Sequence, residues 1–278
     1  MIVVVCLNPA LDVTHRVDAV DWGGVNRPRA VHARPGGKGL NVARTLHALG
    51  VDVLVLGLAG GVTGAGVEAA LRELGVPAAF TPVAGETRRT FSVIDGGRVA
   101  AFHEPGPEVG AAEYAEFRAD YQKAVAGAEA VVLSGSLPPG LPAGTYATLI
   151  QAAGVPAVLD THGEALRRGA AAGAAIVKPN LAELAALAGG PLATRGGPGL
   201  AAVAAGELSG AQAVVVTLGP EGLLAATGDG CWQARVPAVV AGNATGAGDA
   251  VAAAPVAGEF RHQDYLGALR AVAVEEVR

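Results

Sequence analysis

Cysteine is scarce in this 278-residue sequence, which contains Cys6 and Cys231 alone, far apart along the chain. Two cysteines at this spacing exclude a zinc site built on closely spaced thiolates and a disulfide framework. Unpaired cysteines are typical of a reducing compartment. We therefore expect a cytoplasmic protein.

Charge is also sparse, because charged residues make up 16% of the chain, with 20 basic against 25 acidic residues. A net charge of −5 gives no extended positive field, which argues against nucleic acid as a partner. No apolar run reaches the ~18 residues of a membrane-spanning helix, and the first run is too short and lacks the basic leader of a signal peptide. We expect no membrane partner, and we expect any anionic ligand to be held by a few local side chains.

Hydrophobic residues, by contrast, reach 51%, enough for one large core in a single domain over residues 1–278. Short β-branched runs predict buried parallel strands at Ile2–Leu7, Val53–Leu58, Ala130–Ser134, Ala157–Asp160, Ala175–Lys178 and Ala213–Leu218. Helical apolar spacing occurs at Gly39–Leu49, Gly64–Leu74, Ala112–Ala126, Thr145–Ala153, Leu181–Ala188 and Gly199–Leu208. This alternation predicts an α/β fold with a doubly wound, mostly parallel sheet and helices on both faces.

Two segments interrupt this alternation, residues 13–33 and residues 88–103. The second has apolar residues at every other position and the turn Asp95-Gly96-Gly97, so we expect hairpins outside the main sheet. Ligands of open α/β sheets bind beyond the carboxyl ends of the strands. A small β-sheet made from these hairpins would therefore serve as a lid over the binding crevice.

The stretch NATGAGDA, residues 243–250, leads through small residues from a loop into a helix. Backbone N–H groups at a helix N-terminus bind anions, so Gly246, Ala247 and Gly248 are candidates for holding the charge on a transferring phosphoryl group. Asp249 would then face the attacking hydroxyl and accept its proton as a general base. The same spacing is equally compatible with an Asp249 that only caps the helix.

A second glycine cluster, PGGKGLN at residues 35–41, also opens a helix but matches neither the P-loop nor the dinucleotide-binding pattern. Its backbone and Asn41 are candidates for binding sugar hydroxyls, or the glycines only turn the chain into the helix. A dinucleotide-dependent oxidoreductase is disfavoured, because the first strand leads into NPALD and not into a glycine-rich phosphate turn.

Seven motifs taken together resemble the ribokinase-like carbohydrate kinases, in the phosphofructokinase B branch that contains 1-phosphofructokinase and tagatose-6-phosphate kinase. In order, they are LNPALD (7–12), GGKGLN (36–41), TR (87–88), SGSLPPG (134–140), VKPNLAEL (177–184), TLGPEG (217–222) and NATGAGDA (243–250). They cover nearly the whole chain. The resemblance implies a ribokinase-like fold and direct in-line transfer of the γ-phosphoryl group of ATP, with Mg²⁺, to a sugar hydroxyl.

The resemblance also implies a substrate site made of Asp12, Arg27, Gly37, Lys38, Asn41, Arg88 and Ser136. In it, Asp12 and Asn41 would orient sugar hydroxyls, while Arg88 would reach a substrate phosphate from the lid. Arg27 looks like a second phosphate contact. Plainer roles stay open, since Asp12 and Ser136 are also good turn residues and both arginines could be solvated surface residues.

A nucleotide site is implied at Lys178, Asn180, Glu183, Thr217, Gly219 and Gly222. Because Mg²⁺ keeps several waters and takes few protein ligands, Asn180 and Glu183 would hold it through water. For Glu183 the alternative is a plain carboxylate in the first turn of a helix.

The chain departs from the family pattern after Asp249, where GDAVAA runs directly into APVAGEF. We expect a helical segment of roughly 30 residues to be missing near residues 252–254, judged from the usual length of two helices and their connection. A single helix from Asp249 to Gly258 would count against this expectation.

The motifs favour a phosphorylated ketohexose as acceptor: fructose 1-phosphate, converted to fructose 1,6-bisphosphate, with tagatose 6-phosphate or fructose 6-phosphate as alternatives. A different class also fits the fold, a sugar-phosphate binding or regulatory protein that has lost turnover. Members of this branch commonly dimerise through the lid, so the resemblance implies a homodimer. Val25, Phe91 and Val99 are candidates for that interface, or they face the main domain.

Overall fold

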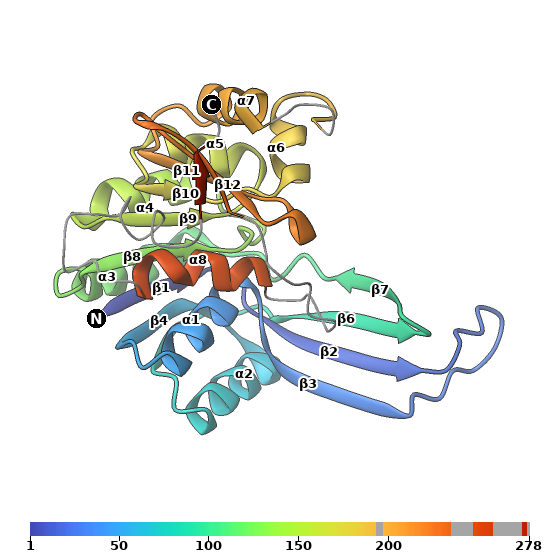
Figure 1. The fold of residues 1–278 in the computed structure, drawn as a ribbon. Coiled ribbons are helices and arrows are strands. Elements are labelled where there is room, and N and C mark those ends of the chain that lie inside the picture. The colour runs from blue at the N-terminus through green and yellow to red at the C-terminus, as the bar shows by residue number, and fades with distance from the viewer. Residues whose placement is uncertain (193–196, 235–246, 258–273, 277–278) are drawn as a thin grey trace.

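The computed structural model describes residues 1–192, 197–234, 247–257 and 274–276. Its main sheet has ten strands in the order β14-β13-β12-β11-β10-β9-β8-β1-β4-β5 (Figure 1). Neighbours from β11 to β5 pair in parallel, while β12, β13 and β14 form an antiparallel edge. The strands are β1 (Ile2–Cys6), β4 (Val53–Ala59), β5 (Ala78–Pro82), β8 (Ala130–Ser134), β9 (Ala157–Asp160), β10 (Ile176–Val177), β11 (Ala213–Thr217), β12 (Leu223–Thr227), β13 (Gly230–Ala234) and β14 (Val274–Glu276).

The central strand β1 is buried along its whole length, because it lies between β4 and β8 and helices cover both faces of the sheet. Val3 and Val5 pack into one hydrophobic core, and Ile2, Val4 and Cys6 pack into the other. A strand buried on both faces has no need for alternating polar residues, which explains the uninterrupted apolar run at the start of the sequence.

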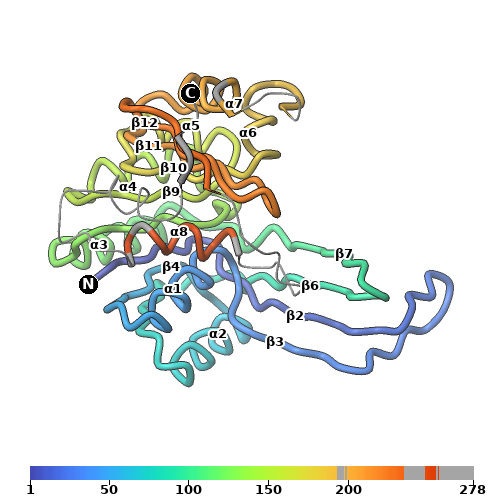
Figure 2. The backbone as a smooth tube through the Cα atoms, in the orientation of Figure 1, coloured from blue at the N-terminus to red at the C-terminus, as the bar shows by residue number. Residues whose placement is uncertain are grey.

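The helices divide between these two cores. α1 (Lys38–Ala48), α2 (Gly61–Glu73) and α8 (Ala247–Ala257) cover one face, and α8 lies beside α1 although the two are far apart in sequence (Figure 2). The other face is covered by α3 (Ala111–Val125), α4 (Thr145–Ala153), α5 (Gly163–Ala171), α6 (Leu181–Leu187) and α7 (Gly197–Glu207). The doubly wound α/β fold predicted from the sequence is confirmed. Within the described residues, we find no helix long and apolar enough to cross a membrane.

A separate small sheet extends away from the main body (Figure 1). It contains β2 (Ala10–Val17), β3 (Ala30–Gly36), β6 (Arg88–Asp95) and β7 (Arg98–His103) in the order β3-β2-β6-β7. β2 pairs with β6 in parallel, and the two other pairings are antiparallel. The predicted hairpins are therefore present, and they combine into one sheet that starts close to the carboxyl end of β1.

Several elements were not predicted: β5, α5, β12 and β13. α5 carries the polar sequence GEALRRGAA and buries Ala165, Leu166, Gly169 and Ala170, of which Leu166 is the one large residue, so its apolar signal is low. β5 is an edge strand with mostly exposed side chains, which removes the apolar signal that marks the central strands.

α8 bears on the segment predicted to be missing near residues 252–254. The helix runs without a break through these residues and ends at Ala257, while Gly258 lies outside the described residues. Its continuity counts against an interruption inside the helix. The missing segment itself stays a prediction.

Candidate active site

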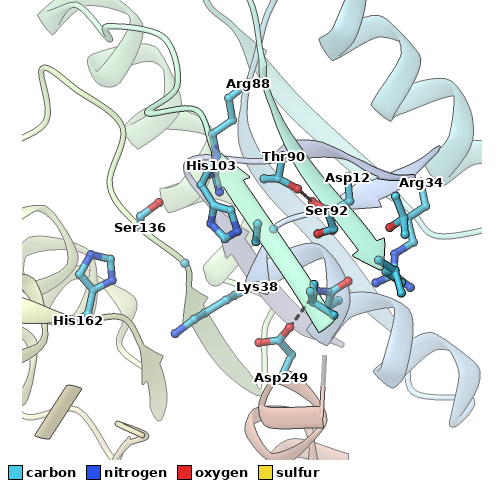
Figure 3. Close-up of a pocket in the computed structure, with 17 residues that line it drawn as sticks. Asp12, Arg34, Lys38, Arg88, Thr90, Ser92, His103, Ser136, His162 and Asp249 are labelled. Carbon is cyan, nitrogen blue, oxygen red and sulfur yellow. Dashed lines mark hydrogen bonds between the residues drawn. The ribbon is translucent and has the colours of Figure 1, made fainter. Parts of the chain in front are cut away.

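A cavity of about 480 Å³ lies where the small sheet meets the carboxyl ends of the central strands and the beginnings of α1 and α8 (Figure 3). It brings together seven residues that were predicted for the catalytic and substrate-binding site: Asp12, Gly37, Lys38, Asn41, Arg88, Ser136 and Asp249. Since these residues come from five separate motifs, the fold assembles the predicted substrate site from distant parts of the chain.

Asp249 lies in the first turn of α8 and is 8% exposed. Asn41 Nδ2, on α1, donates a hydrogen bond to Asp249 Oδ2 over 2.8 Å. Burial raises the pKa of this carboxyl, the charge of Asp160 raises it further, and Asn41, Lys38 and Lys178 oppose the rise. A carboxylate with a raised pKa that faces a cavity is suited to accept a proton.

The anion site predicted from the sequence lies at the N-terminus of α8. The helix begins at Ala247, so Ala247 and Gly248 lie in its first turn, where backbone N–H groups have no partner within the helix. Lys178 Nζ is close by, since a β-carbon added at Gly248 would lie 3.8 Å from it. Helix amides and an ammonium group therefore converge beside Asp249. Gly246 lies outside the described residues.

A network of ion pairs joins the cavity to residues that were predicted to bind nucleotide. Lys38 Nζ donates to Asp160 Oδ1 over 2.9 Å and to Glu183 Oε1 over 3.1 Å. Asp160 is fully buried, and its other oxygen lies 3.2 Å from Lys178 Nζ. Burial alone would lower the pKa of Lys38, but the carboxylates of Asp160 and Glu183 outweigh it and raise that pKa. Lys38 is therefore held as a cation at the cavity wall.

Asp160 was not predicted as a site residue. It ends β9, one strand away from the SGSLPPG loop, and a single aspartate after an apolar run carries little signal in a sequence. Its position at the carboxyl end of a parallel strand was the only available indication.

The predicted nucleotide residues lie at the ends of β10 and β11. Asn180 caps α6, accepting from Glu183 N over 2.8 Å, and Glu183 Oε2 accepts from Asn180 N over 2.8 Å. Asn180 also bridges to Thr217 at the end of β11, and Gly219 and Gly222 flank the turn that follows. Asn180 and Thr217 are thus neighbours, but none of these residues lines the cavity. No group of three potential metal ligands occurs within the described ranges.

A row of side chains crosses the small sheet beside the cavity. The strand register aligns Arg34 with Asp12, Asp12 with Thr90, and Thr90 with His103. Thr90 Oγ1 donates to Asp12 Oδ1 over 2.6 Å, and Gly36 leaves the space that the Asp12 carboxylate occupies. All four residues line the cavity (Figure 3). Of these, Asp12 alone was predicted, because the pairing that places the others follows from a strand register the sequence does not encode locally.

The two arginines predicted to contact phosphate differ in position. Arg88 lines the cavity, and its guanidinium donates to the carbonyl oxygens of Asn8 over 3.1 Å and Glu104 over 3.2 Å. Arg27 lies exposed in the loop between β2 and β3 and is not among the residues that line the cavity. The role of Arg27 in binding phosphate stays a prediction.

Ser136 follows β8 and Gly135, whose φ of 116° is a conformation that favours glycine. Tyr146 Oη donates to Gly135 O over 3.1 Å, and Gly135 N donates to Asp160 O over 2.9 Å. These bonds hold the serine at the cavity wall. His162, which also lines the cavity, precedes the unpredicted helix α5.

Comparison with known families gives a match over residues 3–274 to the pfkB family of carbohydrate kinases. The match covers nearly the whole chain, including every motif that forms the cavity.

Comparison with solved structures gives the same result. The tetrameric inhibited form of phosphofructokinase-2 from Escherichia coli superposes with a TM-score of 0.84 at 32% identity, over 91% of this chain and 85% of that one. The same enzyme in complex with fructose-6-phosphate gives 0.82 at 32% identity, with the same coverage. A possible 1-phosphofructokinase from Thermotoga maritima gives 0.83 at 26% identity, over 100% of both chains.

Proposed function

Because the chain belongs to the pfkB family of carbohydrate kinases and is a sugar kinase, we propose that it transfers the γ-phosphoryl group of ATP to fructose 1-phosphate, giving fructose 1,6-bisphosphate. The observation that carries this proposal is one cavity with the buried carboxylate of Asp249 and two groups suited to a phosphate, Arg88 and Ser136. A sugar whose phosphate is bound by Arg88 and Ser136 would turn a free hydroxyl toward Asp249.

In the proposed reaction, the acceptor hydroxyl attacks the γ-phosphorus, ADP leaves, and Asp249 takes the hydroxyl proton. The N–H groups of Ala247 and Gly248, with Lys178 beside them, would stabilise the charge on the transferring group. The raised pKa of Asp249 and its position in the cavity lining support a role as the base over a role limited to helix capping. The same features argue against a binding protein without turnover.

ATP would occupy the side of the site formed by Lys178, Asn180, Thr217, Gly219 and Gly222. Mg²⁺ bound with it would neutralise phosphate charge. The residues fit binding of this ion through water, because Asn180 and Glu183 supply the hard oxygen atoms that Mg²⁺ prefers. Both oxygens of Asp160 face ammonium groups, Lys38 Nζ over 2.9 Å and Lys178 Nζ over 3.2 Å. Asn180 and Glu183 would act through water, with Glu183 exchanging its contact with Lys38.

Fructose 6-phosphate is the second candidate acceptor, favoured by the similarity to a phosphofructokinase-2 solved with that sugar. Tagatose 6-phosphate is the third. A coupled assay of ADP release with ATP and Mg²⁺ separates these sugars from one another and from unphosphorylated fructose. Fructose 1-phosphate should give the highest kcat/KM, and a higher value for another phosphosugar would replace it in the proposal.

We also propose that two chains associate through the small sheet. Large apolar side chains are exposed on both faces of this sheet and in its loop. Val31 and Phe102, each 55% exposed, lie on the face away from the cavity, and Val99, 64% exposed, lines the cavity. Trp22, 82% exposed, and Val25, 76% exposed, lie in the loop between β2 and β3. Exposed large apolar side chains are a common feature of interfaces. The test is molar mass in solution for the native chain and for Val25→Asp, which should shift toward the monomer.

A cytoplasmic location is proposed from the free thiols of Cys6 and Cys231.

A further inference from the structure

We propose that Asn8 is a positioning residue for phosphate recognition: its side-chain amide orients the Ser136 hydroxyl as a hydrogen-bond donor toward the substrate, while its backbone carbonyl fixes Arg88. The inference rests on the proposed function, in which Ser136 and Arg88 hold the phosphate of the sugar. It concerns a residue that neither lines the cavity nor contacts the reacting atoms.

The orientation of the Asn8 amide is set by its surroundings. Asn8 is 4% exposed and follows β1 directly behind the cavity wall. Its Nδ2 lies 2.9 Å from Pro105 O and 3.1 Å from Ser136 Oγ. Because a carbonyl oxygen can only accept, the atom that faces Pro105 must be the nitrogen, and the opposite assignment would place two oxygens against each other.

This orientation determines what Ser136 can offer to a ligand. Both hydrogens of Asn8 Nδ2 are used, one for Pro105 O and one for Ser136 Oγ. Ser136 therefore accepts a hydrogen bond from behind, so its own O–H points away from Asn8. Ser136 lines the cavity, and within the described residues its hydroxyl has one hydrogen bond, the one that it accepts from Asn8. A phosphate oxygen, which only accepts, is the complementary partner.

Through its backbone carbonyl, Asn8 also contacts Arg88, the other residue proposed to bind the substrate phosphate. Arg88 Nε donates to Asn8 O over 3.1 Å, and Arg88 Nη1 donates to Glu104 O over 3.2 Å. These two bonds fix the plane of the guanidinium and leave N–H groups on its other side available. The side chain and the backbone carbonyl of Asn8 thus fix Ser136 and Arg88, the two residues proposed to donate hydrogen bonds to the phosphate.

The oxygen atom of the Asn8 amide is left in an unfavourable environment by this arrangement. Asn8 Oδ1 is buried and accepts no hydrogen bond from the described part of the chain. Gly106 packs against it with a φ of 100°, and a β-carbon there would overlap Oδ1. An unpaired buried oxygen is unfavourable in a protein interior. The nitrogen, held by Pro105 and Ser136, is therefore the end that the fold keeps satisfied.

The test uses Asn8→Ala, which removes the side-chain amide and keeps the carbonyl that holds Arg88. We expect the KM for fructose 1-phosphate and its Kd, measured by calorimetry without ATP, to rise about tenfold, as for loss of one hydrogen bond to a charged group. The KM for ATP should stay unchanged. Asn8→Asp reverses the polarity, so it should weaken binding more, because the hydroxyl then donates to the carboxylate and a like charge faces the phosphate.

Coupling to Ser136 separates positioning from general stabilisation. Ser136→Ala alone should weaken phosphosugar binding, and adding Asn8→Ala to it should cause no further loss. Thr145→Val is the matched control, since Thr145 is buried and its hydroxyl donates to Pro142 O over 2.7 Å in the segment that follows Ser136. It should lower the midpoint of thermal unfolding and leave phosphosugar binding unchanged.

Three outcomes would overturn the inference. They are an unchanged KM and Kd in Asn8→Ala, effects of Asn8→Ala and Ser136→Ala that multiply in the double variant, and an equal loss of binding in Thr145→Val. Failure of the proposed function is distinct, because the native chain itself would then neither bind nor phosphorylate fructose 1-phosphate.

Discussion

Asn41 Nδ2 donates a hydrogen bond to Asp249 Oδ2 over 2.8 Å, which joins two residues 208 positions apart in the sequence. The bond favours the charged carboxylate, whereas burial favours the neutral acid, and burial is the larger effect because the pKa is raised. Asn41 is thus bound to the proposed base in addition to its predicted place beside the sugar. The contact connects the start of α1 with the start of α8.

Replacing Asp249 by Asn tests the base directly. The amide keeps the size of the side chain and can still accept from Asn41, but it cannot take a proton at neutral pH. We expect kcat to fall by about 10²–10⁴-fold, the range for loss of a general base, with the KM for ATP little changed. Single-turnover kinetics measure this, and a kcat within twofold of the native value would rule out Asp249 as the base.

The same variant should be more stable than the native chain at neutral pH. A carboxyl whose pKa is raised by folding binds its proton more tightly in the folded state, so its contribution to stability is lost as pH rises from the ordinary value of 3.8 through the folded pKa. Because an amide does not ionise, the Asp249→Asn variant does not lose this stability as the pH rises. Urea unfolding should therefore show a higher free energy of unfolding for the variant at neutral pH and little difference below pH 3.8. A less stable variant at neutral pH would contradict the raised pKa.

Lys38 should control the pH profile of the reaction. Its charge lowers the pKa of Asp249, so Lys38→Met should raise that pKa further. Because the base acts when deprotonated, the acid limb of the kcat profile should move to higher pH. Lys123→Met serves as a control, since Lys123 is exposed on α3 and pairs with Asp120. A limb that stays in place or moves to lower pH in Lys38→Met would contradict the conclusion that the charge of Lys38 lowers the pKa of Asp249.

Two neighbouring arginines offer a matched pair for phosphate binding. Arg88 lines the cavity, while Arg89 is 51% exposed and pairs with Glu104. Arg88→Ala should raise the KM for fructose 1-phosphate by about 10–100-fold, as expected for loss of hydrogen bonds to a charged group, and Arg89→Ala should not. Turnover of unphosphorylated fructose, however slow, should be equal in the native chain and Arg88→Ala. Equal effects of the two substitutions on KM would argue against a specific phosphate contact.

The central fold could be predicted because its strands are buried on both faces and therefore carry continuous apolar runs, as Val3 and Val131 illustrate. The helices between them have apolar stripes that face one core or the other. The edge strand β5 was missed because few of its side chains are buried, and α5 was missed because its buried residues, apart from Leu166, are small.

The candidate site could be predicted where a residue belongs to a local motif, as for Asn41 and Asp249. Arg34 and Thr90, which line the cavity, and Asn8, which contacts Ser136, were missed because these positions depend on strand register and on contacts between loops, which no short stretch of sequence specifies. Arg27 shows the reverse: its motif singled it out, but in the folded chain it is exposed and away from the cavity lining.

The most direct test is release of ADP, measured with ATP, Mg²⁺ and fructose 1-phosphate, for the native chain beside Asp249→Ala. We predict turnover by the native chain that is lost in the variant and is much weaker when unphosphorylated fructose replaces the phosphosugar. If the native chain released no ADP with fructose 1-phosphate, fructose 6-phosphate or tagatose 6-phosphate, the assignment as a sugar-phosphate kinase would be contradicted.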